Sequence, residues 1–306
     1  MGQGRTRDKS VDGTPRTQEP QVPLSQGEKQ QLQDDFVTWV THTGPSQPRS
    51  FNPTDYASLI IAGGYPEANA RADRSRARWF NAYVRGVTDH DAAQVSRLAS
   101  LDRLQVLLRL LAAQTSHELV LAHTSRATGV PERSLPPYVR LLDDLYLTLR
   151  LPPWGRNLTK RVVGREKAVV ADVGLAAHLN GASKSVLDDI LQRDRLGDLL
   201  ESLVATELAK QQTWSETDFR LFHFRDTTGR EVDLVVELAD GRIIGIETKA
   251  STGLSRTDFK GLAALRDLMG PLFVAGVVLY TGVEEIPWGD RLRAIPVSAL
   301  WQHDML

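Results

Sequence analysis

Apolar and polar positions alternate in the last third of the chain and predict neighbouring β-strands. The runs are "FRLFHFR", "EVDLVVEL" and "RIIGIETKA". A helical pattern, "GDLLESLVATELAKQQ", precedes them, and a second one, "RTDFKGLAALRDLMG", leads to the strand "LFVAGVVLY". The order αβββαβ indicates a mixed α/β sheet with helices on its faces.

The preceding residues are predicted to be helical. "NPTDYASLIIAGGYPEA" indicates a helix that begins at residues 52–53 and breaks at the glycine pair 63–64. In the next pattern, Trp79, Tyr83 and Val87 recur at every fourth position, which predicts an amphipathic helix against a core.

Residues 102–151 predict a helix, a short helix, a turn, a longer helix and then strands. This order is typical of a winged helix-turn-helix. The helix that starts near Glu132 would contact DNA, but Arg133 and Arg140 are its only cations. Because many winged helices bind proteins instead, we favour a protein-interaction role for this unit over DNA contact.

The most basic run in the chain follows, with Lys160, Arg161, Arg165 and Lys167. It is either a nucleic-acid contact or, as is usual for such runs, a solvated hairpin. Together these patterns divide the chain into a disordered tail or remnant (1–50), a helical lid-like segment (51–100), a winged-helix-like unit (101–165) and the α/β domain (166–306).

Composition and charge indicate the cellular compartment of the protein more clearly than its function. The 306 residues carry a net charge of −1, so nucleic-acid binding would need a local basic patch. The chain has no cysteine, which excludes disulfides and thiolate metal sites and favours a reducing cytoplasm. No apolar run approaches the roughly 18–20 residues of a membrane span.

The turn of the predicted hairpin decides where its charges lie. A two-residue Asp-Gly turn would pair Asp233 with Thr248 and place Asp233 and Glu247 on opposite faces. A three-residue loop, with Gly241 in a left-handed conformation, pairs Leu238 with Arg242 and therefore Asp233 with Glu247. Opposed Cβ atoms on paired strands lie about 4.5–5.5 Å apart.

Two carboxylates held that close need a cation between them. Mg²⁺ suits the position, since it uses one or two carboxylates together with water and phosphate oxygens. Lys249 would lie beside the ion and orient water or stabilise phosphate charge. A further carboxylate would come from the preceding helix, where Glu207 falls within the apolar arc and Glu201 at its edge.

Asp233, thirteen residues and then Glu247-Thr248-Lys249 resemble the D…ExK signature of PD-(D/E)xK nuclease-like proteins. More closely, "GGYPEA", "RARWFNAYVRGVTDHD", "NLTKRVVGREKAVVADVGLAAHL", "LGDLLESLVATEL" and the hairpin are similar to AAA+-type ATP-binding proteins that end in domain of unknown function (DUF) 4143. The resemblance runs from about residue 52 to 306.

The resemblance implies a restriction-endonuclease-like fold and metal-dependent hydrolysis of nucleic acid, with Asp233 and Glu247 as metal ligands. The alternative is a non-catalytic DNA-binding or protein-interaction module that works with an ATPase in trans. ATP binding by this chain is not expected, because it contains no G-x-x-x-x-G-K-[ST] loop, and we expect a truncated or split member of the group. "HD" at residues 90–91 also departs from the Arg-Asp that is usual there.

Overall fold

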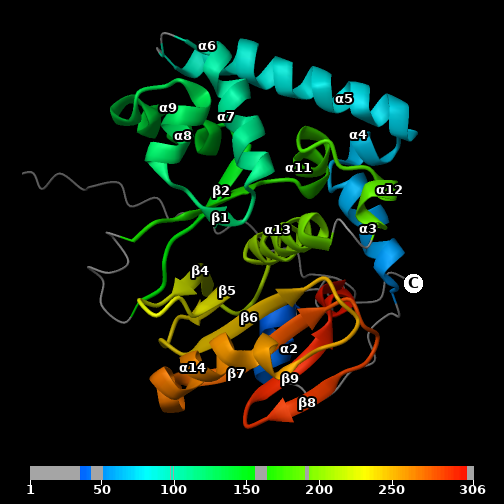
Figure 1. Cartoon of the computed structure of the whole chain (residues 1–306), viewed down its shortest axis with the longest axis vertical. Coiled ribbons are helices and arrows are strands. Elements are labelled where there is room, and N and C mark those ends of the chain that lie inside the picture. Colours follow the sequence, from blue (N-terminus) through cyan, green and yellow to red (C-terminus); the bar gives the residue numbers. More distant parts are fainter. Residues whose placement is uncertain are drawn as a thin grey trace, which may run out of the picture.

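A computed structural model describes residues 35–42, 51–96, 98, 100–155, 164–189 and 193–301. The larger sheet has six strands. Figure 1 shows a mainly helical part at the top, this sheet at the bottom and helix α13 between them. The predicted α/β class is therefore confirmed, with helices in the first half and a mixed sheet in the second.

Helix α3 (Pro53–Ala62) begins and ends where the sequence predicts. The side chain of Asn52 accepts a hydrogen bond from the backbone of Asp55, and Asp55 returns one to the backbone of Asn52. This reciprocal capping satisfies two amide donors at the helix start. Gly63 stops the helix at a φ of 70°, a left-handed conformation that favours glycine.

The amphipathic helix α5 (Asp73–Arg85) continues through a π-helical turn, η1 (Gly86–Asp91), into α6 (Ala92–Val95). Its predicted apolar stripe is confirmed. The rings of Trp79 and Tyr83 stack with centroids 5.1 Å apart, and Val87 is buried. The short helix α4 (Pro66–Asn69) packs beside α5.

The next unit contains the elements in the predicted order. They are α7 (Asp102–Ala113), β1 (His117–Glu118), α8 (Leu121–Thr128), η2 (Glu132–Ser134), α9 (Leu135–Asp144), β2 (Thr148–Leu151) and β3 (Lys167–Val170). The three strands form an antiparallel sheet in the order β1-β3-β2. The expected domain boundary after residue 165 falls between β2 and β3, so this sheet takes strands from both sides of it.

Three helices connect this sheet to the second half: α11 (Val173–Leu179), α12 (Lys184–Leu187) and α13 (Arg193–Gln211). The side chain of Asp172 caps α11 by accepting a hydrogen bond from the amide of Leu175. Among the described helices, none combines the length and the apolar character that a membrane crossing requires.

The large sheet has the strand order β4-β5-β6-β7-β9-β8. Its strands are β4 (Phe219–Arg225), β5 (Glu231–Leu238), β6 (Ile243–Lys249), β7 (Phe273–Tyr280), β8 (Ile286–Gly289) and β9 (Leu292–Pro296). β6 and β9 run parallel to β7, whereas the outer pairs are antiparallel. Short helices η4 (Arg256–Phe259), η5 (Gly270–Leu272) and η6 (Val297–Trp301) flank α14 (Lys260–Met269) and the last strand.

Helices cover both faces of this sheet. α13 and α2 (Phe36–His42) share one core cluster with Leu234, Val236 and Ile244, and α14 shares the other with Val235 and Ile243. Figure 1 shows α14 in front of the sheet and α2 behind it.

Within the segment 1–50, expected to be a disordered tail or a remnant, α2 is an ordered helix. Phe36 and Val37 are fully buried, and α2 packs against β7 and η6. These apolar residues lie at one end of a long polar segment, so the composition of the whole segment concealed them.

Candidate active site

The hairpin of β5 and β6 takes the register of a three-residue loop. Leu234 pairs with Ile246 and Glu237 with Ile243, and the amide of Leu238 donates to the carbonyl of Arg242 at 2.8 Å. Gly241 has a φ of 82°. The predicted loop register is confirmed as far as the pair Leu234–Ile246, and Asp233 lies close enough to Glu247 for its charge to raise the pKa of that carboxyl.

Glu247 lies on the α14 side of the sheet, whereas a register shift between Val232 and Val235 interrupts the alternation at Asp233, which interacts with Lys167 and Glu201 from β3 and α13. Gly245 shares the face of Glu247, because side chains alternate along a strand. A Cβ atom at Gly245 would meet Leu262 and Leu265 of α14. The carboxylate of Asp233 is held across the strands by the amide of Thr248, which donates to its Oδ2 at 2.8 Å.

The carboxyl group of Glu247 is only partly hydrogen-bonded. Its Oε1 is 2.8 Å from Nζ of Lys249, but its buried Oε2 has no hydrogen-bond partner in the described part of the chain. Burial and then the charge of Asp233 raise the pKa of Glu247 to about 8. Burial also raises the pKa of Asp233. A proton or a metal cation would relieve this pair.

Glu201 approaches the same cluster from α13. Nζ of Lys167, from β3, lies 2.9 Å from Oε1 of Glu201 and 2.9 Å from Oε1 of Glu231, and the Lys167 side chain is 3% exposed. Burial would lower the pKa of Lys167, but the charges of Glu201, Asp233 and Glu231 raise it. Burial, followed by the charge of Asp233, raises the pKa of Glu201 well above its usual range.

Glu207 does not join this cluster. It pairs with Lys210 and accepts a hydrogen bond from Nε1 of Trp301 at 2.9 Å. It lies six positions after Glu201, which corresponds to about 9 Å along the helix. Its side chain therefore also points in a different direction from the helix axis. Of the two helix carboxylates that the sequence singled out, the structure brings only Glu201 to the hairpin.

A metal would have to be held by few protein ligands. Within the described ranges, no three His, Cys, Asp or Glu side chains are placed so that they could hold an ion. Mg²⁺ nevertheless needs only one or two carboxylates when water and phosphate complete its shell. The buried, unpartnered Oε2 of Glu247 and the neighbouring carboxylate of Asp233 fit that requirement.

The sequence did not predict two members of this cluster, Lys167 and Glu231. Lys167 was assigned to a basic surface run, yet it is buried and neutralises carboxylates. The apolar residues that follow it in "KAVV" are the available signal, since a strand without alternation is covered on both faces. Glu231 precedes Asp233 by two positions and therefore shares its face of β5.

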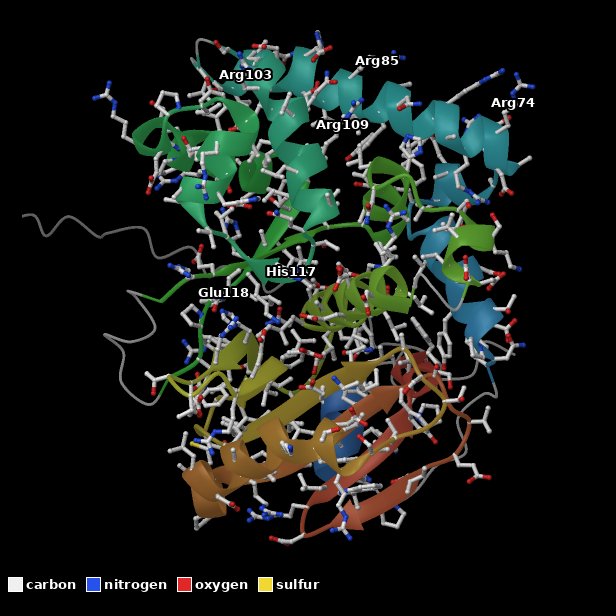
Figure 2. The ribbon with its side chains drawn as sticks, viewed as in Figure 1. Arg74, Arg85, Arg103, Arg109, His117 and Glu118 are labelled. Carbon is white, nitrogen blue, oxygen red and sulfur yellow. The ribbon has the colours of Figure 1, made fainter. Side chains whose placement is uncertain are left out.

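The other predicted nucleic-acid residues are described only in part. Arg133 and Arg140 are exposed, Arg165 pairs with Glu118 at 3.8 Å, and Lys160 and Arg161 lie outside the described residues. Figure 2 shows Arg74 and Arg85 on α5, far from the sheet, and His117 and Glu118 near the junction of the two halves.

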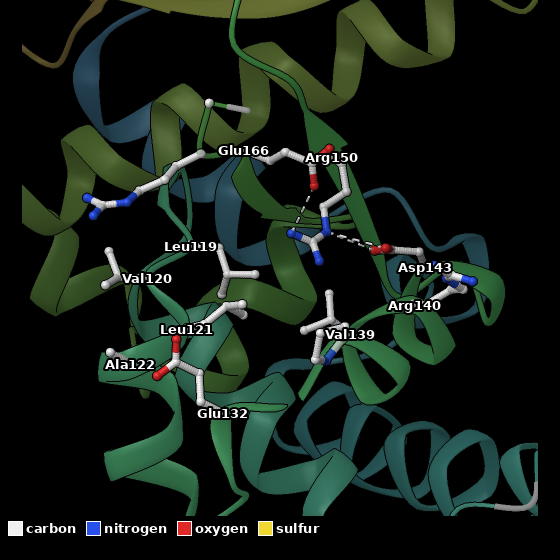
Figure 3. Close-up of a pocket in the computed structure, with 13 residues that line it drawn as sticks. Leu119, Val120, Leu121, Ala122, Glu132, Val139, Arg140, Asp143, Arg150 and Glu166 are labelled. Carbon is white, nitrogen blue, oxygen red and sulfur yellow. Dashed lines mark hydrogen bonds and ion pairs between the residues drawn. The ribbon is translucent and has the colours of Figure 1, made fainter. Parts of the chain in front are cut away.

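A cavity of about 640 Å³ lies between α8, α9 and the start of β3 (Figure 3). Arg140 and Arg165 line it, but so do Glu132, Asp143 and Glu166. Arg150 in its wall is paired with Asp143 at 3.3 Å and Glu166 at 3.6 Å. The lining is therefore of mixed charge rather than basic.

Residues 196–300 match the family model "Domain of unknown function (DUF4143)". This segment runs from α13 to η6 and contains every member of the cluster except Lys167. Residues 53–186 match a separate model, "Domain of unknown function (DUF8612)". The DUF4143 match therefore covers the C-terminal part of the resemblance expected from about residue 52, and the helical half matches a model of its own.

Among solved structures, the chain is similar to protein VC1899 from Vibrio cholerae, with 16% identity and a TM-score of 0.24. The match covers 77% of this chain and 53% of that protein, so the chain spans about half of its length. The TM-score is too low for this likeness to support an argument. Comparison with curated proteins gave no match.

Proposed function

We propose that the DUF4143 segment is a PD-(D/E)xK-like domain that hydrolyses phosphodiester bonds of nucleic acid with the help of Mg²⁺ or Mn²⁺. The observation that supports this most directly is the hairpin, which brings Asp233 close to Glu247 and to the ammonium group of Lys249. A bound divalent ion would supply Lewis-acid activation of the phosphate and of a water molecule.

In this proposal Asp233 and Glu247 hold the ion. The Thr248 amide fixes the orientation of Asp233, and burial keeps competing water away from both carboxylates. Lys249 is 31% exposed, so its ammonium group can reach a phosphate from solvent while it stays bonded to Glu247. Its positive charge would stabilise the negative charge that develops on phosphate oxygens.

In this proposal Lys167 and Glu201 do not contact the substrate, and they adjust the net charge around the metal ligands. Lys167 binds Glu201 and Glu231 and offsets part of the negative charge around Asp233. Glu201 is thus a positioning residue, since its contact is with the lysine and it holds that lysine in place.

The helical half would supply further contacts to DNA. We propose that α7 to β3 is a winged helix-turn-helix, supported by its element order and by the β1-β3-β2 sheet. Arg133 and Arg140 on η2 and α9 would contact phosphates, because both side chains are exposed.

A non-catalytic binding module is the second candidate function. One observation favours it: a buried lysine already satisfies Glu201 and Glu231, as expected of a nuclease-like scaffold stabilised without metal. Such a module would bind DNA or a protein, in combination with an ATPase in trans.

Cleavage assays distinguish these candidates. We expect purified protein with Mg²⁺ or Mn²⁺ to nick plasmid DNA or to cut labelled oligonucleotides, and Lys249→Ala to abolish the activity. Lys184→Ala, which removes an exposed lysine of α12, is the matched control. Equal cleavage by wild type and Lys249→Ala, or none on single- and double-stranded substrates, would eliminate the catalytic proposal and leave the binding module.

A further inference from the structure

We infer that a groove between η4, α14 and β8 binds single-stranded nucleic acid, with a base on Trp288 and phosphates at Arg256 and Lys260. This inference names how a substrate strand is held and in that respect builds on the proposed function. The groove encloses a cavity of about 510 Å³, and all three side chains line it.

The two cations of the groove, Arg256 and Lys260, form no ion pair with an acidic side chain among the described residues. Both side chains are exposed. The nearest acid in sequence, Asp258, is occupied at the start of η4, where it accepts from the amide and the hydroxyl of Ser255 at 2.7 and 2.9 Å.

Neighbouring arginines outside the groove behave differently. Arg266 bonds to Asp267 at 2.9 Å, and Arg291 lies 3.4 Å from Asp290. Arg256 and Lys260 therefore differ from these two neighbouring arginines in having no acidic partner among the described residues. Two free cations beside an open cavity favour an anionic ligand.

Trp288 provides a rigid aromatic surface next to these cations. Its ring stacks on Phe259 with centroids 4.4 Å apart and an interplanar angle of 5°. Phe259 is only 2% exposed and belongs to the core under α14, so it fixes the indole, which is itself only partly buried. A held indole can stack with any base without losing side-chain freedom.

The combination favours a single strand over a duplex. In a duplex each base is already stacked and paired, whereas a single strand presents unpaired bases to aromatic side chains and phosphates to nearby cations. An acidic protein would satisfy the cations but has no need of an indole positioned by a buried ring.

The groove lies on the same side of the sheet as Glu247, since α14 covers the face that Gly245 shares with Glu247. η4 begins seven residues after Lys249. Burial would lower the pKa of Lys249, but the charges of Glu247, Asp233 and Asp258 raise it. Asp258, in η4, is therefore electrostatically linked to Lys249.

Binding can be tested apart from cleavage, with the full chain, EDTA and a fluorescein-labelled twelve-residue oligo(dT) in an anisotropy titration. Loss of one stacked base lowers affinity by about 5- to 150-fold, so Trp288→Leu should weaken binding at least about fivefold. Arg256→Gln with Lys260→Gln should also weaken binding and reduce the slope of log K against log salt by about 1.4.

Matched controls are Trp214→Leu, which removes an exposed indole outside the groove, and Lys184→Gln with Arg195→Gln, which removes two exposed cations elsewhere. They should bind as wild type does. Should Trp288→Leu fail to fold, as judged by thermal melting, the Arg256/Lys260 double variant at the surface decides alone.

Groove variants that bind within twofold of wild type would overturn the inference. So would equal or tighter binding of a duplex, or of an acidic polyglutamate peptide, because either result would indicate a surface selected by charge only. Binding as expected without cleavage under Mg²⁺ would remove the proposed catalysis and keep the groove. Cleavage by the wild type together with unchanged binding by the groove variants would keep the proposed catalysis and remove the groove.

Discussion

Nζ of Lys167 lies 2.9 Å from Oε1 of Glu201, and this buried pair joins the small sheet of the helical half to helix α13. The same nitrogen reaches Glu231 on β5. One side chain thus connects three elements that are far apart in the sequence, and it brings a positive charge close to the candidate catalytic carboxylates.

Replacing this lysine should destabilise the fold strongly. In Lys167→Met, Glu201 and Glu231 lose their shared partner, and breaking a buried pair costs about 3–5 kcal/mol. Urea denaturation would measure the free energy of unfolding. In the control Arg71→Met, which breaks an exposed pair, the loss should stay below about 1 kcal/mol. Adding Glu201→Gln to Lys167→Met should recover part of the loss, and a loss below 1 kcal/mol for Lys167→Met would contradict its role.

Stability should depend on pH through Glu247. Its pKa is about 8 in the folded protein against an ordinary value of 4.5, so the folded chain retains the proton that the unfolded chain releases. The contribution of Glu247 to stability is therefore complete below pH 4.5 and is lost as the pH rises towards 8, by up to about 1.4 kcal/mol per pH unit.

Glu247→Gln mimics the protonated side chain, so its free energy of unfolding should fall less than that of wild type between pH 5 and pH 8. The difference between the two proteins isolates Glu247 from other shifted groups, such as Asp233 and Asp172. Parallel pH profiles for wild type and variant would show that Glu247 does not titrate in this range.

Divalent ions should bind at Asp233 and Glu247 even if the protein cleaves nothing. Isothermal calorimetry with Mn²⁺ should give one site in wild type that Asp233→Asn weakens at least tenfold, since a ligand charge is lost. Glu207→Gln is the matched control, because that carboxylate lies with Lys210 and Trp301 instead. Equal affinity of wild type and Asp233→Asn would exclude this metal site.

Two glycines should respond in opposite directions to alanine. A Cβ at Gly174 would lie 2.7 Å from Cα of Gly63, so Gly174→Ala must separate α11 from the end of α3 and should cost more than about 1 kcal/mol. Gly197 in α13 faces open space, and Gly197→Ala should stabilise by about 0.5–1 kcal/mol. Thermal melting checks both, and a neutral Gly174→Ala would argue against close packing there.

Capping residues and hydrophobic periodicity in the sequence predict many of the helices and strands. The limits of α3, the stripe of α5 and the order of strands β4 to β7 follow from capping residues and periodicity, which act over a few positions. α2 was missed because its stability comes from β7 and η6, more than 200 residues away. The sequence had no local signal for that contact.

The sequence by itself determined the hairpin register next to its turn, because the three-residue loop and its glycine decide which strand positions face each other. Only the tertiary structure decided that Glu201 rather than Glu207 approaches the hairpin, and that Lys167 is buried there. Both outcomes depend on how α13 and β3 pack against the large sheet. Such packing is set by contacts between distant segments, which periodicity along the chain does not encode.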